Sequence, residues 1–279
     1  MVFLGSKLKN LFFLFFFLQC GYAAAAQTEP ESLEAGFHHM YNLDFPAAHK
    51  TFETWQELHP EDPLGAAANG AAYLFAEFER MHILQLDLFT EKRKLEEESK
   101  MQPDPEIKMA FETELAKADE IAANILAETP NDRNAMFART FTDGLRGNYA
   151  ALVEREKGKG LNFLKSSRSK AEKLIALDST YYDAYLAIGI ENYLLGLRSA
   201  PTRWFLRLSG AQTNKDKGIA NLRITAEKGR YLKPYARLLL VIAALRDRDR
   251  GTAKKLLTDL AREFPQNRIY QIELGRLRS

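Results

Sequence analysis

The chain has 279 residues, of which 46% are hydrophobic, and its 39 basic residues barely outnumber its 37 acidic ones. So small a net charge creates no field that would attract nucleic acid, and this class of partner is excluded. A chain of this length and apolar content is large enough to bury a core by packing alone.

The first 26 residues have the pattern of a secretory signal peptide. Lys7 and Lys9 precede the apolar run Leu11–Leu18, and Ala23–Ala26 supplies the small residues that signal peptidase requires. We therefore predict cleavage after Ala26 and an exported protein, in the periplasm or cell envelope. The alternative is an uncleaved anchor, although the stretch from residue 11 to residue 26 is shorter than the about 20 residues that span a bilayer.

The single cysteine, Cys20, lies within this segment. A lipoprotein signal would have a small residue before it, and Gln19 stands there instead, so we favour a cysteine in a peptide that is removed. The remaining chain then has no cysteine, which excludes disulfides and thiol catalysis. Loss of Lys7 and Lys9 also leaves 37 basic against 37 acidic residues, a formal charge of zero.

Residues 29–60 predict two helices joined by a tight turn. Asp44 is a suitable N-cap for the second helix, which Pro60 ends. Apolar residues recur in it at spacings of three and four, on one face: Phe45, Ala48, Phe52 and Trp55. Gly36 in the first helix costs about 1 kcal/mol relative to alanine, so we expect it to admit a closely packed neighbour.

The next helix begins after Pro63 and carries Gly70, and its periodic pattern continues to Phe89, too far for a standard repeat. A highly charged segment with two prolines follows, and we interpret it as a solvated turn because its charges cancel. The irregular stretch covers residues 76–106. A helical pattern resumes at Ile107 and runs to Pro130.

A third unit begins at Asn131 and has Thr140 where a glycine is expected. We predict its second helix over Tyr149–Leu177 and a further helix over Tyr182–Tyr193. Residues 197–216 then form an insertion of loop-forming residues around a short basic and aromatic turn, residues 203–208. Beyond it we predict a helix over residues 217–228, a last pair of helices over 234–265, and a capping helix over 268–278.

An interval of 34 residues separates Gly36 from Gly70, and Val241 from Gly275. At three places an alanine precedes a proline by 12 residues: Ala48 and Pro60, Ala118 and Pro130, Ala253 and Pro265. With these features the chain resembles the tetratricopeptide-repeat (TPR) superfamily, whose repeats are about 34 residues long. The resemblance implies an all-α, right-handed superhelix of about five helix-turn-helix units plus a C-terminal capping helix, as a single domain over residues 27–279.

Members of this superfamily bind a protein segment on a concave surface lined by their first helices. In this chain the inward-facing positions are apolar: Phe37, Tyr41, Leu74, Phe75, Leu186, Ile190, Tyr193, Tyr235, Leu238 and Ile242. They lack the lysines and asparagines of a carboxylate clamp. We therefore expect a non-catalytic scaffold with a groove for an apolar polypeptide segment. The alternative is that these residues are packed in the protein's own interior.

The insertion supports a second hypothesis, contact with a membrane surface. It places Trp204 and Phe205 between Arg203 and Arg207. Aromatic rings lie among lipid headgroups and arginines bind phosphates, so this segment suits an interface.

The sequence offers no motif for catalysis or for a cofactor. The five histidines are His38, His39, His49, His59 and His82, and no two of them have the spacing that places zinc ligands on one helix face. Phosphate-binding loops, a nucleophile elbow and a dinucleotide fingerprint are also missing from the sequence. We therefore expect no enzyme, no cofactor and no metal.

Overall fold

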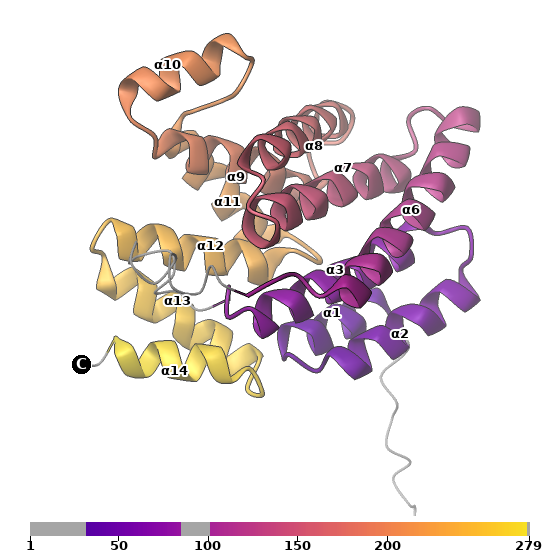
Figure 1. Cartoon of the computed structure of the whole chain (residues 1–279), viewed down its shortest axis with the longest axis horizontal. Helices are drawn as coiled ribbons and strands as arrows, with labels where there is room; N and C mark the ends of the chain where they lie inside the picture. The colour runs from indigo at the N-terminus through magenta and orange to yellow at the C-terminus, as the bar shows by residue number, and fades with distance from the viewer. Residues whose placement is uncertain (1–31, 85–100, 278–279) are drawn as a thin grey trace, which may run out of the picture.

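The computed structural model describes residues 32–84 and 101–277, and the part it describes is built of α-helices without a β-strand (Figure 1). The all-α prediction is thereby confirmed. The predicted signal peptide lies outside the described residues. The helices are α1 (Leu33–Tyr41), α2 (Phe45–Leu58), α3 (Pro63–Arg80), α6 (Pro105–Glu128), α7 (Arg133–Asn148), α8 (Lys157–Leu177), α9 (Tyr185–Gly196), α10 (Ala200–Leu208), α11 (Lys215–Lys228), α12 (Lys233–Arg246), α13 (Arg250–Glu263) and α14 (Arg268–Arg276).

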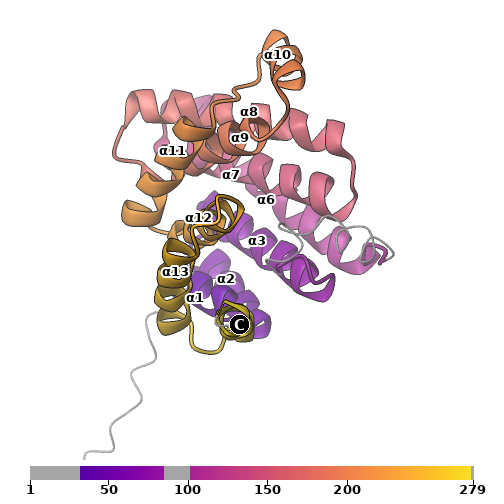
Figure 2. The same cartoon turned by 90° about the vertical axis from the view of Figure 1, so that its left-hand side faces the viewer.

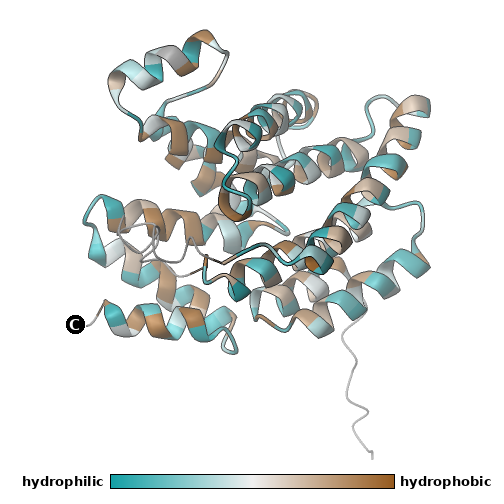
Figure 3. Cartoon of the chain, in the orientation of Figure 1, coloured by the Kyte–Doolittle hydropathy of each residue, from teal (hydrophilic) through white to brown (hydrophobic). Residues whose placement is uncertain are grey.

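Successive helices pack against each other along the whole described chain, from α1 on α2 to α13 on α14. Helix α10 is the exception in this series, because α9 packs directly on α11 and α10 projects from the body (Figures 1 and 2). Contacts also join α1 to α3, α3 to α7, and α7 to α9. Hydrophobic and hydrophilic residues alternate along these helices, as in amphipathic helices that share a core (Figure 3).

Two turns far apart in the sequence have the same construction. Leu43 and Arg248 adopt left-handed backbone conformations, with φ of 66° and 63°. The next residue in each case is an aspartate that caps the following helix: Asp44 accepts from the amide of Ala47, and Asp249 from that of Thr252. Four residues after the capping aspartate stands a fully buried alanine, Ala48 in one turn and Ala253 in the other.

The glycines expected to admit a neighbouring helix do so at Gly36 and Gly70. A Cβ atom on Gly36 would lie 2.3 Å from Cε1 of Phe52, and one on Gly70 would lie 2.5 Å from Cδ2 of Leu115. Gly275, which shares the 34-residue interval, differs from them, because a Cβ atom there would meet nothing within 4 Å. Of these three glycines, Gly36 and Gly70 permit close packing of a neighbouring helix, and Gly275 does not have this role.

Two predicted helix boundaries and the predicted structure of the insertion are wrong. Helix α3 ends at Arg80 instead of Phe89, because His82 takes a left-handed conformation, with φ of 59°, and the amide of Ile83 bonds back to the carbonyl of Phe78. The helix expected to start at Tyr149 starts at Lys157, because α7 continues through a π-helical turn, Tyr149–Val153. The insertion contains a helix of 9 residues, α10, instead of a single turn.

Candidate interaction site

Nine of the ten residues predicted to face inward are buried, and Tyr235 is half-buried. An open peptide groove is therefore not found among them in the described part of the chain. Their burial agrees with the alternative interpretation, in which these side chains pack in the protein's own interior. Seven of them nevertheless meet around one cavity: Phe37, Tyr41, Leu74, Phe75, Leu186, Ile190 and Tyr235. Leu238 lines a smaller cavity beside it, and neither Tyr193 nor Ile242 lines one of the two.

The larger of these two cavities has a volume of about 40 Å³. That is room for about three water molecules, so a small apolar group would fill it and a peptide backbone would not enter. Its lining residues come from α1, α3, α7, α8, α9 and α12, so helices far apart in the sequence meet around it. Half-buried residues occur in the lining at four positions: Gly144, Asn148, Ala187 and Tyr235.

Aromatic residues of the cavity wall pack on one another and on Tyr231 behind it. Phe37 stacks on Tyr231 with ring centroids 5.1 Å apart, and Phe75 meets Tyr41 and Tyr235 edge to face at 5.8 and 5.5 Å. Such geometries are favourable for aromatic quadrupoles. The wall is thus fixed by contacts between helices of the N-terminal and C-terminal parts of the chain.

Polar contacts also join the two ends of the described chain. The side-chain amide of Asn267 donates to the carbonyl oxygen of Tyr41 at 2.8 Å, and the Tyr41 hydroxyl donates to the carbonyl oxygen of Tyr231 at 3.1 Å. Two ion pairs accompany them, Arg230 with Glu34 and Arg268 with Glu79. These contacts hold α1 and α3 against the C-terminal part of the chain, close to the cavity that Tyr41 lines.

Asp183 is a buried polar residue of the cavity wall that sequence reasoning missed. Its carboxylate accepts from three successive backbone amides, those of Arg230 at 2.9 Å, Tyr231 at 3.2 Å and Leu232 at 2.9 Å. Burial raises the pKa of this carboxyl, and the three N–H donors counteract part of that shift. Asp183 thus fixes the start of α12 beside α9. In the sequence, the only indication of this role is that an aspartate stands among residues with a helical pattern.

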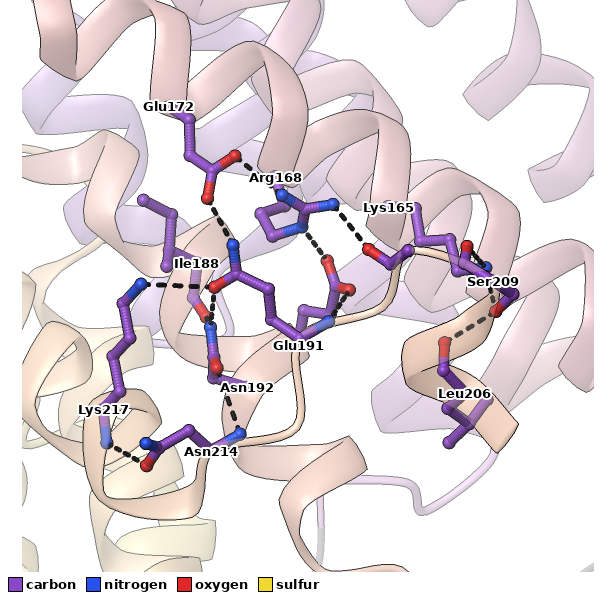
Figure 4. Close-up of polar contacts among 12 residues, drawn as sticks. Lys165, Arg168, Glu172, Ile188, Glu191, Asn192, Leu206, Ser209, Asn214 and Lys217 are labelled. Carbon is purple, nitrogen blue, oxygen red and sulfur yellow. Dashed lines mark hydrogen bonds and ion pairs between the residues drawn. The ribbon is translucent and has the colours of Figure 1, made fainter. Parts of the chain in front are cut away.

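A polar network holds the segment that follows α10 (Figure 4). The carboxylate of Glu191, which is 0% exposed, accepts from Nε of Arg168 at 2.6 Å and from the backbone amide of Gln212 at 2.9 Å. Asn192 bonds the side chain of Gln212 and the amide of Asn214. The segment after α10 is therefore tied to α8 and α9 by partly buried bonds, which are strong when every group is satisfied.

Helix α10 itself carries exposed apolar residues. Trp204 is 63% and Leu208 is 68% exposed. Arg203 donates to the carbonyl oxygen of Arg198 at 2.6 Å, and Nε of Arg207 donates to the Thr213 hydroxyl at 2.7 Å. The four residues predicted for a membrane or partner contact thus share one projecting helix, although the side chain of Phe205 lies outside what the structure describes.

The histidines are dispersed among structural contacts. Nδ1 of His49 lies 2.6 Å from Oδ1 of Asn69, and His59 packs on Trp55 with centroids 4.1 Å apart. Within residues 32–84 and 101–277 there is no group of three or more His, Cys, Asp or Glu that could hold a metal. A search of the same residues finds no helix with the length and apolar character needed to cross a membrane.

Comparisons of the chain with models of protein families, with curated proteins and with solved structures give no match.

Proposed function

We propose that this protein is a non-catalytic interaction protein of TPR type, and that it binds an apolar side chain of a partner polypeptide in the cavity on its concave face. The observation that carries the proposal is the convergence of seven predicted inward-facing residues on one apolar cavity. Binding sites are commonly concave, mostly apolar and formed between helices.

The repeated turn supports the TPR-type part of the proposal. Leu43 and Arg248 share a left-handed conformation, an aspartate cap follows each of them, and a buried alanine stands four residues beyond the cap. Contacts from α1 to α3, from α3 to α7 and from α7 to α9 agree with a stack whose first helices are neighbours.

The size of the cavity limits what can enter it. About 40 Å³ of space suits a single small aliphatic side chain, so the partner would contribute one anchor residue while its backbone stays outside. An apolar anchor in a water-poor pocket is typical of the residues that dominate the affinity of an interface. Export to the periplasm or cell envelope, as the N-terminal segment predicts, remains part of this proposal.

Peptide selection against the purified chain tests the proposal. We would select binders from a random library and measure their affinity for the unaltered chain and for Ala187→Leu, which extends a half-buried lining residue into the cavity. We expect binding to weaken at least about tenfold, since the anchor loses its space. Ala220→Leu makes the same change at an exposed position of α11 and is the matched control. Equal affinity for both variants would contradict the proposal.

A further inference from the structure

Helix α10 presents large apolar side chains to solvent. Trp204 and Leu208 are four residues apart in one helix, so they lie on the same face, and they are 63% and 68% exposed. No described side chain of α10 is buried, and the helix projects from the body of the molecule (Figures 1 and 2). Neighbouring exposed side chains of this kind mark an interaction surface.

The same segment is basic. Between Asn192 and Asn214 the chain contains three arginines, Arg198, Arg203 and Arg207, and no acidic residue. The side-chain hydrogen bonds of Arg203 and Arg207 go to a carbonyl and a hydroxyl oxygen, neither of which carries a charge. These bonds orient the guanidinium groups without neutralising them.

The helix is fixed at its C-terminal end. Lys165 of α8 donates to both the carbonyl and the hydroxyl oxygen of Ser209, at 2.9 and 2.8 Å, and Nη2 of Arg168 donates to the carbonyl oxygen of Gly210 at 3.1 Å (Figure 4). The buried Glu191 holds the next residues through the amide of Gln212. The exposed face of α10 is therefore presented by a supported element.

We propose that α10 docks on a membrane surface rich in anionic phospholipid. Trp204 and Leu208 would lie at the boundary of headgroups and acyl chains, while Arg203 and Arg207 bind lipid phosphates. A helix of 9 residues is too short to span the bilayer, so it lies on the surface.

The positive charge of the segment favours an anionic membrane over a second copy of the chain as the partner of α10. Two α10 faces placed together would bring arginines against arginines with no acidic residue of the segment to separate them, which opposes association. A membrane with anionic headgroups offers the opposite sign. The inference is independent of the function proposed above, because α10 does not line the cavity.

Tryptophan fluorescence tests the proposal locally. The chain has 2 tryptophans, so Trp55→Phe leaves Trp204 as the sole reporter. We would mix the full chain with vesicles of phosphatidylglycerol and phosphatidylcholine whose acyl chains are brominated, because bromine quenches only a tryptophan that reaches the acyl region. We expect quenching of Trp204 in these vesicles and none in vesicles of phosphatidylcholine alone. This readout is unaffected by any contribution of the apolar N-terminal segment to vesicle binding.

Two further variants complete the test. Arg203→Gln with Arg207→Gln should raise the lipid concentration needed for half-maximal quenching by about 25-fold, since each cation near an anionic surface contributes about fivefold to binding. Trp204→Phe in the otherwise unaltered chain gives the signal of Trp55, which should not change with vesicles, and circular dichroism checks folding of each variant. Unquenched Trp204 on vesicle-bound protein overturns the proposal. A fluorescence change that follows protein concentration without lipid also overturns it, in favour of self-association.

Discussion

Asn267 and Tyr41 are 226 positions apart in sequence, and the side-chain amide of Asn267 donates to the backbone carbonyl of Tyr41 at 2.8 Å. The same side chain caps α14 by accepting from the amide of Ile269 at 3.0 Å. A single buried residue therefore both starts the last helix and attaches it to the end of the first one. This attachment lies beside the cavity, because Tyr41 belongs to the cavity wall.

Asn267→Ala should lower the free energy of unfolding by about 2 kcal/mol. The variant loses an N-cap, worth about 1 kcal/mol, and leaves the buried carbonyl of Tyr41 without this donor. Urea unfolding measures the change. Asn214→Ala is the control, because Asn214 is an exposed residue that caps α11 through the amide of Lys217. An equal loss in both variants would show that the contact with Tyr41 adds no stability.

Gly36→Ala should destabilise the fold by about 1 to 3 kcal/mol. The new methyl group would lie 2.3 Å from Cε1 of Phe52, whose fully buried ring has little room to move. Gly275→Ala should instead be neutral or stabilising, by up to about 1 kcal/mol, because the position is helical and open. Thermal melts of the two variants should shift in different directions, and a stabilised Gly36→Ala would contradict the packing described here.

Glu191→Ala should cost about 3 kcal/mol, because it leaves the guanidinium of Arg168 without its fully buried partner. Glu172→Ala removes a partly exposed partner of the same arginine and should cost about 1 kcal/mol or less. Chemical denaturation compares the two. In addition, protease cleavage within residues 197–214 should become faster in the Glu191 variant than in the Glu172 variant, since Glu191 holds the backbone amide of Gln212 and Glu172 holds only its side-chain amide.

Local signals in the sequence predicted much of the helical framework. Asp44 caps α2 as expected, and the helix predicted from Ile107 to Pro130 corresponds to α6. These features depend on residues close together in sequence, such as caps and prolines. The close approach at Gly36 was also predictable, because a glycine inside a helix needs a packing reason.

The failures have specific physical causes. Leu84 is buried although it follows the end of α3, so apolar residues of a turn imitated the periodicity of a longer helix. A new helix was predicted from Tyr149, but α7 continues to Asn148 and contains Gly147, whose Cβ position lies 3.3 Å from Cβ of Phe163. In both cases contacts with distant residues, and not the local sequence pattern, determine where the helix ends.

The candidate site was predictable in part. The resemblance to tetratricopeptide repeats implied ten inward-facing side chains, and seven of them line one cavity. Periodicity carries no information on how closely the first and last helices approach, so it could not tell an open groove from a closed one. The contact of Asn267 with Tyr41 is of that long-range kind.

The central claim, that a partner binds in the cavity lined by Phe37, Tyr41 and Tyr235, is tested most directly by photo-crosslinking in the cell. A benzophenone amino acid would replace the half-buried Tyr235 of the cavity wall or, as a control, Met109, which is 68% exposed on α6. We predict a discrete crosslinked polypeptide from position 235 that competing peptide removes, and none from position 109. Crosslinks from position 109 alone, or none from 235 in a folded protein, would contradict the account.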